Sequence, residues 1–237
     1  MAAPANSTVY VDDDDDAGRH SLHWLIESVG LNVMSFGRPT EFFDAYDDSR
    51  PGCLVLDLRL PEMSGLELQE RLRAQGVRIP VIMITAYGDI PTAVRAMKGG
   101  AVDFIEKPFN DQALLDRIQQ CIQLDQQMRE VNASFEEVRQ RYSTLTKRER
   151  QVMALLVVGK SNKPVAEMLG ISPKTVEVHR AKVMEKMRAD SIVFLVHMAR
   201  MCGIREDPDL VADPRFKSLL LQFEVGAAPE DQAAARQ

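Results

Sequence analysis

Four places in the sequence carry side chains suited to phosphoryl chemistry. A run of five acidic residues spans Asp12 to Asp16, and a further carboxylate, Asp57, directly follows an apolar run. A hydroxyl follows another apolar run at Thr85, and Lys107 supplies an ammonium group. Carboxylate oxygens suit Mg²⁺, which takes one or two of them and keeps several waters. An aspartate can become an aspartyl phosphate while cations stabilise charge on the transferring group, so these residues predict a magnesium-assisted phosphoryl acceptor.

The elements between these residues must bring them together. Apolar runs at 9–11, 32–36, 53–56, 81–84 and 102–105 indicate five strands, and helical patterns separate them. This alternation predicts a doubly wound α/β fold with a five-stranded parallel sheet. Sites in such folds lie at the carboxyl ends of the strands, where Asp57, Thr85 and Lys107 stand. Taken singly, each residue is more often a solvated or capping side chain, but their joint placement favours a site.

The same segment resembles a known family. Residues 7–124 look like a response-regulator receiver domain, with matches at Asp13-Asp14, LVLDLRLPEMSGLEL, VIMITAYGD and GAVDFIEKPF. The resemblance implies that Asp57 is phosphorylated and that Thr85 and Lys107 bind the phosphoryl oxygens. It implies a magnesium site made of Asp13, Asp14, Asp57 and the backbone carbonyl of Arg59. It also implies Thr85 and Phe104 as switch residues and a cis Lys107-Pro108 bond, which X-Pro sequences allow.

Asp12 departs from this resemblance. The position before the acidic pair is normally apolar and ends the first strand, so Asp12 places a carboxylate where burial is expected. Burial of a carboxylate is costly unless it finds a partner. Counting from Ser21-Leu22 and from Asp57 favours Asp13-Asp14 as the pair. The alternative pair, Asp12-Asp13, needs a compensating insertion downstream.

Composition and charge set the broad class of the protein. The chain has 237 residues, 45% hydrophobic and 27% charged, which excludes wholesale disorder and allows two small domains or one large one. No membrane span or secretory signal is predicted, and three widely spaced cysteines suit a reducing compartment, so we expect a cytoplasmic protein. Residues 1–124 carry 11 basic and 19 acidic side chains, whereas residues 144–203 carry 11 and 5. The basic block suggests a nucleic-acid-binding module, although an ordinary domain with a basic face is the alternative.

A long helix is expected between the two halves. Apolar residues recur at alternating spacings of 3 and 4 over more than three heptads: Cys121, Leu124, Met128, Val131, Phe135, Val138, Tyr142 and Leu145. Gly and Pro are absent from residues 109–158, so nothing interrupts the helix. The stripe predicts a two-stranded parallel coiled coil; the alternative is one amphipathic helix packed on its own domains.

The basic block carries a helix-turn-helix pattern. Thr146 and Glu149 form a capping box, and Ser172 with Pro173 opens a later helix after a Gly-containing turn. In that later helix Val176, Val183 and Met187 share one face, which we expect to be core. Other residues of that helix are the expected DNA contacts: Lys174, Thr175 and Lys182 to phosphates, and Glu177, Val178 and Ala181 to base edges. His179 and Arg180 lie nearer the core side, so one or both are expected to be structural or to contact phosphates. The alternative is a small helical bundle for protein contacts.

This block has a resemblance of its own. Residues 143–203 look like the LuxR-type four-helix DNA-binding domain through LTKRERQVMALLVVGKSNKPVAEMLGISPKTVEVHRAKVMEKM, with Pro164 as the clearest departure. Together the two resemblances imply a two-component response regulator of the FixJ/NarL family. The expected domains are a receiver at 7–124, a helical linker at 125–143, a DNA-binding domain at 144–203 and a partly disordered C-terminal extension at 204–237, with a helix near 214–223.

The resemblance implies a function and partners. A sensor histidine kinase would phosphorylate Asp57 and favour homodimers, formed through the receiver and the linker helix, that bind double-stranded promoter DNA. RNA polymerase is a further candidate partner, Mg²⁺ the cofactor, and a membrane no partner. The protein is expected not to be an enzyme. Two rivals stay open: a DNA-binding protein whose receiver no longer responds to phosphate, and a phosphoester hydrolase that uses the same acids.

Overall fold

The chain divides into two compact units within one helix, between Glu130 and Val131. The computed structural model describes residues 6–225, with side chains as far as Leu221. The expected disorder of the tail beyond residue 225 therefore lies outside the described residues. Each unit has its own hydrophobic core.

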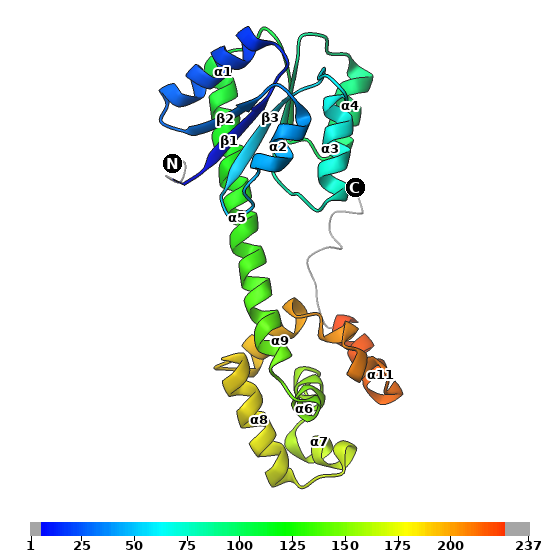
Figure 1. The fold of residues 1–237 in the computed structure, drawn as a ribbon. Helices are drawn as coiled ribbons and strands as arrows, with labels where there is room; N and C mark the ends of the chain where they lie inside the picture. Colours follow the sequence, from blue (N-terminus) through cyan, green and yellow to red (C-terminus); the bar gives the residue numbers. More distant parts are fainter. Residues whose placement is uncertain (1–5, 226–237) are drawn as a thin grey trace, which may run out of the picture. The chain divides into compact units, whose positions relative to one another are not determined.

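The N-terminal unit is built on a five-stranded parallel sheet, as predicted (Figure 1). Its strands, in the spatial order β2-β1-β3-β4-β5, are β1 Thr8–Asp12, β2 Asn32–Phe36, β3 Gly52–Asp57, β4 Val81–Thr85 and β5 Asp103–Glu106. The register pairs Asp12 of β1 with Leu56 of β3, so the ends of these neighbouring strands lie side by side. The order reverses between β1 and β3, and this switch point is where ligand sites of doubly wound sheets lie.

Helices cover both faces of the sheet (Figure 1). They are α1 Asp16–Ser28, α2 Pro39–Ala45, α3 Gly65–Ala74, α4 Ile90–Lys98 and α5 Asp111–Ser143. Alternate strand residues point to opposite faces. Val9 and Val55 therefore join the core under α1 and α5, whereas Tyr10 and Leu54 join the core under α2, α3 and α4.

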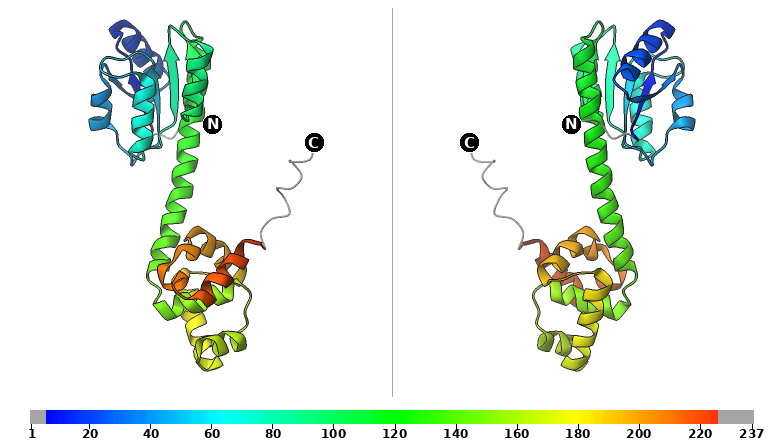
Figure 2. Two further views of the ribbon diagram at one scale, coloured as in Figure 1. Left: turned by 90° about the vertical axis from the view of Figure 1, so that its right-hand side faces the viewer. Right: turned by 90° about the vertical axis from the view of Figure 1, so that its left-hand side faces the viewer.

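The long helix α5 is continuous, as the absence of Gly and Pro predicted, and both side views of Figure 2 show it as one helix. Its middle is anchored to the N-terminal unit by a buried carboxylate. Asp125 accepts hydrogen bonds from the Gly52 amide at 2.8 Å and from Arg129 Nε at 2.7 Å, and Arg129 also binds the Asp48 carbonyl. These bonds fix α5 beyond the last turn that packs on the sheet.

The predicted heptad stripe is not exposed to solvent along its whole length. Cys121 is buried in the N-terminal core, and Val138, Tyr142 and Leu145 are buried in the C-terminal core. The stripe pattern is therefore satisfied at both ends inside single units, which was the alternative explanation. Only the stretch from Leu124 to Phe135 keeps apolar side chains exposed.

The C-terminal unit is all-helical, as predicted. Its first four helices after α5 are α6 Lys147–Val157, α7 Asn162–Leu169, α8 Pro173–Met187 and α9 Ile192–Met201. The Thr146–Glu149 capping box is present, and Ser172 accepts from the Thr175 amide at the start of α8. Gly170 takes a left-handed backbone conformation (φ 64°) that ends α7 and forms the turn into α8.

The segment after α9 is more structured than its sequence indicated. It forms a short 3-10 helix, η1 Ile204–Glu206, then α10 Pro208–Val211 and α11 Pro214–Val225. The helix near residues 214–223 was expected, whereas η1 and α10 were not. Burial of Ile204, Leu210, Phe216 and Leu220 joins this segment to the core of the C-terminal unit.

Candidate functional site: an acidic pocket and a helix-turn-helix surface

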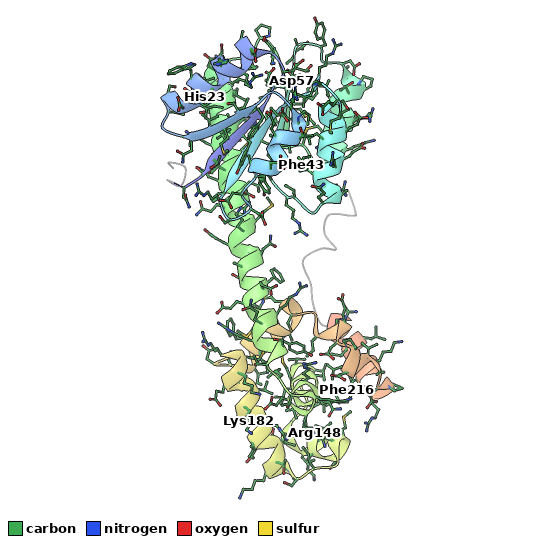
Figure 3. All side chains as sticks on the ribbon, viewed as in Figure 1. His23, Phe43, Asp57, Arg148, Lys182 and Phe216 are labelled. Atoms are coloured by element: carbon green, nitrogen blue, oxygen red, sulfur yellow. The ribbon has the colours of Figure 1, made fainter. Side chains whose placement is uncertain are left out.

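The acidic residues meet at the carboxyl ends of β1 and β3, where Figure 3 labels Asp57. Lys107, just after β5, donates to Asp57 Oδ2 at 2.6 Å and to Asp13 Oδ2 at 2.7 Å. One ammonium group therefore joins residues that lie 50 and 94 positions away along the chain. Asp13 and Asp57 are both buried, so this charged group is sheltered from solvent.

Backbone donors fix the second oxygen of each carboxylate. Asp13 Oδ1 accepts from the Asp15 amide at 3.0 Å, and Asp57 Oδ1 accepts from the Arg59 amide at 2.9 Å. The loop after β3 also turns tightly, because a Cβ built on Gly65 would lie 2.3 Å from the Asp57 carbonyl oxygen. Only glycine fits at this close approach. Both carboxylates are thus held in one orientation before any ligand arrives.

Lys107 is charged in this setting. Burial alone would lower the pKa of its amine, but hydrogen bonds and Coulomb attraction from Asp13 and Asp57 raise that pKa above its ordinary value. The ammonium group compensates two carboxylates that would otherwise repel each other in a sheltered pocket. It also places a positive charge directly beside the Asp57 carboxylate.

Asp12 has the environment that the sequence predicted to be costly. It is the last residue of β1, fully buried, and neither of its carboxylate oxygens has a hydrogen-bond partner within the described structure. Burial, with the Glu41 and Asp13 carboxylates, raises the pKa of Asp12 to about 7, against a lowering effect of Arg19. Asp13, the next residue, contacts Lys107 and belongs to both alternative pairs, Asp12-Asp13 and Asp13-Asp14.

A second surface is formed by α8 of the helix-turn-helix. Val176, Val183 and Met187 are buried against the C-terminal core, as their spacing predicted. The opposite face is exposed and consists of Lys174, Thr175, Glu177, Val178, Ala181 and Lys182. Figure 3 labels Lys182 on this helix. An exposed helix face with basic, hydroxyl and small apolar side chains suits insertion into a DNA groove.

His179 and Arg180 lie between the two faces, as expected. Both are half-buried, and the Nδ1 atom of His179 is buried without a hydrogen-bond partner in the described part of the chain.

At the start of α6, Glu149 is buried and accepts from Lys186 of α8 at 2.7 Å. Burial raises the pKa of Glu149, but the bonds from Lys186 and Thr146 outweigh it and hold this pKa below its ordinary value. This pair fixes α8 against α6.

Comparison with known proteins agrees with both surfaces. Residues 9–119 match the response regulator receiver domain, and residues 143–199 match the bacterial regulatory proteins of the luxR family. The chain is 45% identical over 206 residues to the transcriptional regulatory protein FixJ of Azorhizobium caulinodans, covering 87% of this chain and 98% of that one. It is 44% identical to the nodulation protein W of Bradyrhizobium diazoefficiens, over 85% of this chain and 89% of that one. The solved structure of the response regulator StyR superposes with a TM-score of 0.75 at 45% identity, covering 82% of this chain and 98% of that one.

The chain belongs to the two-component response regulators. It is a DNA-binding transcriptional regulator with a receiver domain and a LuxR-type helix-turn-helix domain. Within the described residues 6–225, no helix of this regulator is long and apolar enough to cross a membrane.

The pocket of the regulator fits a hard cation by the chemistry of its donors. Asp13 and Asp57 supply carboxylate oxygens joined by one ammonium group. Asp14 is exposed on the same loop. Three acidic, His or Cys side chains do not converge on one point among the described residues. Two carboxylates suit Mg²⁺, because this ion commonly takes one or two of them and keeps much of its hydration shell.

The remaining receiver residues lie in β4, in β5 and in the loops that follow β3 and β4. Thr85 is buried at the end of β4, and its hydroxyl accepts from the Tyr87 amide at 3.1 Å. Phe104 is half-buried in β5, and its ring lies 3.1 Å from a Cβ built on Gly88. The Arg59 guanidinium lies over the Tyr87 ring at 4.1 Å from the centroid. The predicted cis bond at Lys107-Pro108 is present.

Some residues with clear structural roles were missed from the sequence. The helix start at Ser64-Gly65 is readable from the sequence, but the close approach of Gly65 to the Asp57 carbonyl oxygen was not predicted. The Arg59–Tyr87 contact had no sequence signal, since the two residues belong to different loops. The same is true of Asp207 in the C-terminal extension, which binds Tyr142 from 65 positions away.

Proposed function

We propose that the regulator accepts a phosphoryl group on Asp57 from the phosphohistidine of a sensor kinase. The main support for this proposal is that the Lys107 ammonium group pairs with both Asp13 and Asp57 at the switch point of the sheet. A carboxylate oxygen of Asp57 attacks phosphorus, the P–N bond to histidine breaks, and the aspartyl phosphate forms. Lys107 and the Thr85 hydroxyl then stabilise the oxygens of the bound group.

A magnesium ion completes this pocket in the proposal. Asp13, Asp14, Asp57 and the Arg59 carbonyl would hold it, and it would supply Lewis-acid charge neutralisation during transfer. Lys107 keeps one positive charge beside Asp57 throughout. Thr85 and Phe104 are the proposed switch pair, because both lie against Gly88, so that movement of Thr85 toward the phosphoryl group opens space for the Phe104 ring.

The test of the phosphoacceptor is a transfer assay. Wild type and Asp57→Asn, which keeps the size but removes the nucleophile, are incubated with a radiolabelled phosphorylated kinase domain, with and without Mg²⁺. We expect labelling of wild type only, and only with Mg²⁺. Equal labelling of the two proteins contradicts the assignment, and release of free phosphate without a labelled intermediate supports a hydrolase instead.

DNA binding is assigned to α8 on the basis of its exposed face. We propose that Lys174, Thr175 and Lys182 contact phosphates, that Glu177, Val178 and Ala181 meet base edges, and that His179 and Arg180 contact the backbone or support the helix. Double-stranded promoter DNA is the proposed target and RNA polymerase a further partner. A regulator that binds the chromosome acts in the cytoplasm, and we propose no enzymatic activity beyond phosphoryl acceptance.

We also propose that the phosphorylated regulator is a homodimer, formed by the receiver and by the exposed middle of α5. The supporting observation is the exposure of Leu124, Val131 and Phe135, at 40%, 53% and 38%. The test replaces both Val131 and Phe135 with Asp. The control is Ala133→Asp, at an exposed position on the side of α5 opposite the stripe. We expect weaker dimerisation of the double variant in sedimentation, with the control unchanged. Equal dimerisation contradicts the role of α5.

A further inference from the structure

The C-terminal extension, residues 204–221 of the described chain, is unlike an appended tail. It lies outside both family matches, the second of which ends at residue 199. Yet it forms η1, α10 and the described part of α11, and it packs on α6. Figure 3 labels Phe216 on α11, where its side chain is almost fully buried. The extension is therefore part of the folded DNA-binding unit.

The first polar contact of the extension holds the joint between α5 and α6. Asp207 is buried, and its Oδ2 accepts from the Tyr142 hydroxyl at 2.7 Å and from Arg150 at 3.3 Å. Its Oδ1 accepts from the Asp209 and Leu210 amides and begins α10. Arg150 also donates through Nε to the Leu145 carbonyl at 3.1 Å, between the two helices. One carboxylate thus links the last turn of α5, the first turn of α6 and the extension.

The Tyr142 hydroxyl acts as a donor in this group. Burial and the adjacent Asp207 carboxylate raise the pKa of Tyr142 far above its ordinary value, so the phenol stays neutral. The Arg150 guanidinium lies 5.5 Å from the centroid of the Tyr142 ring and compensates the buried carboxylate. A buried charge with one partner removed is strongly destabilising.

The second polar contact holds the turn of the helix-turn-helix. Arg215 of α11 donates to the Met168 carbonyl at 3.2 Å, and Arg148 of α6 donates to the next carbonyl, that of Leu169, at 3.1 Å. These are the last carbonyls of α7, which have no partner within their own helix and carry its negative dipole end. Asp213 holds the Arg215 guanidinium in place from its own segment. Two cations from different helices therefore fix the end of α7 just before α8 begins.

We propose that residues 204–221 act as a clasp that positions the recognition helix for DNA. The clasp fixes the α5–α6 joint through Asp207 and the α7–α8 turn through Arg215. Both residues are positioning residues, since they act through other side chains and carbonyls. The inference goes beyond the assignment of α8 as the DNA-contacting helix and concerns how that helix is held.

The experiment uses full-length variants with matched controls. Asp207→Asn is compared with Glu206→Gln, which changes the neighbouring, exposed acid of the same segment. Arg215→Gln is compared with Lys217→Gln, which removes the same charge from the same helix. Calorimetry measures the unfolding of the C-terminal unit. Fluorescence anisotropy, far below the unfolding temperature, measures binding to a duplex selected from random sequences by the wild-type protein and to unselected duplexes of equal length.

Asp207→Asn should lower the unfolding temperature of the C-terminal unit by roughly 10 °C, while Glu206→Gln leaves it nearly unchanged. Arg215→Gln should weaken binding to the selected duplex about fivefold, the effect of one lost hydrogen bond, with the salt slope unchanged. A purely stabilising contact would leave binding unaltered at this temperature. A direct phosphate contact would instead lower the salt slope by about 0.9 and weaken binding to all duplexes.

The clasp is overturned by any of three results: Asp207→Asn unfolding like Glu206→Gln, Arg215→Gln binding like Lys217→Gln, or a reduced salt slope for Arg215→Gln. The phosphorylation assay on Asp57 runs alongside as an independent control. Its outcome concerns the receiver alone, so failure of that assignment and failure of the clasp are distinguishable.

Discussion

Replacing Asp12 with Val should stabilise the N-terminal unit, and increasingly so as the pH rises. Asp12 is fully buried, and its carboxylate has no hydrogen-bond partner in the described structure. Its pKa rises from the ordinary value of 3.8 to about 7 on folding. Below pH 4 the carboxyl group is largely protonated in both the folded and the unfolded state. Its burial then lowers the free energy of unfolding only through the hydrogen bonds to water that its hydroxyl loses. Between these two pKa values the folded state binds more protons than the unfolded state, so the free energy of unfolding falls as the pH rises.

The size of this effect follows from the shift. At about 1.4 kcal/mol per pKa unit, a rise from 3.8 to about 7 removes about 4 kcal/mol of stability by pH 8, an upper estimate for a site that can admit water. Valine carries no charge at any pH and restores an apolar end to β1. The advantage of Asp12→Val should therefore be small at pH 4, grow through pH 5 and 6, and level off above pH 7.

Urea unfolding at several pH values, in a chelating buffer without Mg²⁺, measures this difference. Titrating groups elsewhere, such as the helix-capping acid Glu67 with its lowered pKa, affect both proteins equally and cancel in the comparison. Asp12→Asn is the control: it is uncharged but keeps buried polar atoms, so its curve should be parallel to that of the valine variant and lie below it. Wild type and Asp12→Val curves that stay parallel from pH 4 to 8.5 would refute the reasoning.

Three other outcomes are expected. Gly65→Ala should unfold at a lower temperature and accept phosphate poorly on Asp57, because the new Cβ would lie 2.3 Å from the Asp57 carbonyl oxygen; labelling at the wild-type rate would show that the loop can yield. Lys107→Met should lower the unfolding temperature in the presence of a chelator, because it removes the charge between two carboxylates, and Mg²⁺ should raise this temperature more than it does for wild type. If calorimetry shows that Mg²⁺ raises the unfolding temperature of both proteins equally, Lys107 and Mg²⁺ do not share a site. Lys182→Ala should weaken binding to all DNA and flatten the salt slope by about one unit, while changes at Val178 should alter base preference at roughly 1–3 kcal/mol per mismatched pair; the reverse result in a salt titration would invert the orientation of α8.

The regular elements of both units were largely predictable, because their signals are local. Strand β2 has the predicted bounds, and the buried residues of α8 are those of its apolar face. The Asp57–Lys107 contact also followed, since parallel strands bring their carboxyl ends to one edge. Small differences remain at element ends: β5 covers Asp103–Glu106 where 102–105 was expected, although Val102 still donates to the Val81 carbonyl.

Contacts between distant segments could not be predicted in the same way. A heptad stripe states that apolar residues share one face of a helix, but it does not state which surface covers them. Val138 and Tyr142 fit a coiled coil as well as a domain core, and the structure assigns them to the core. The role of Asp207 was not predictable from the sequence either, because a single aspartate before a proline is typical of an exposed helix start. In the structure this side chain is buried and accepts a hydrogen bond from the Tyr142 hydroxyl.

Because both ends of the apolar stripe on α5 are buried within single units, only its middle is left as a surface for dimerisation. The exposed stretch from Leu124 to Phe135 is shorter than two heptads, and isolated helical pairs of that length are marginal in water. Such a seam adds to an association only when another surface holds the two copies together. The linker-based part of the proposed dimer is therefore expected to depend on contacts of the phosphorylated receiver. A seam of more than three heptads would have held two chains together in either state.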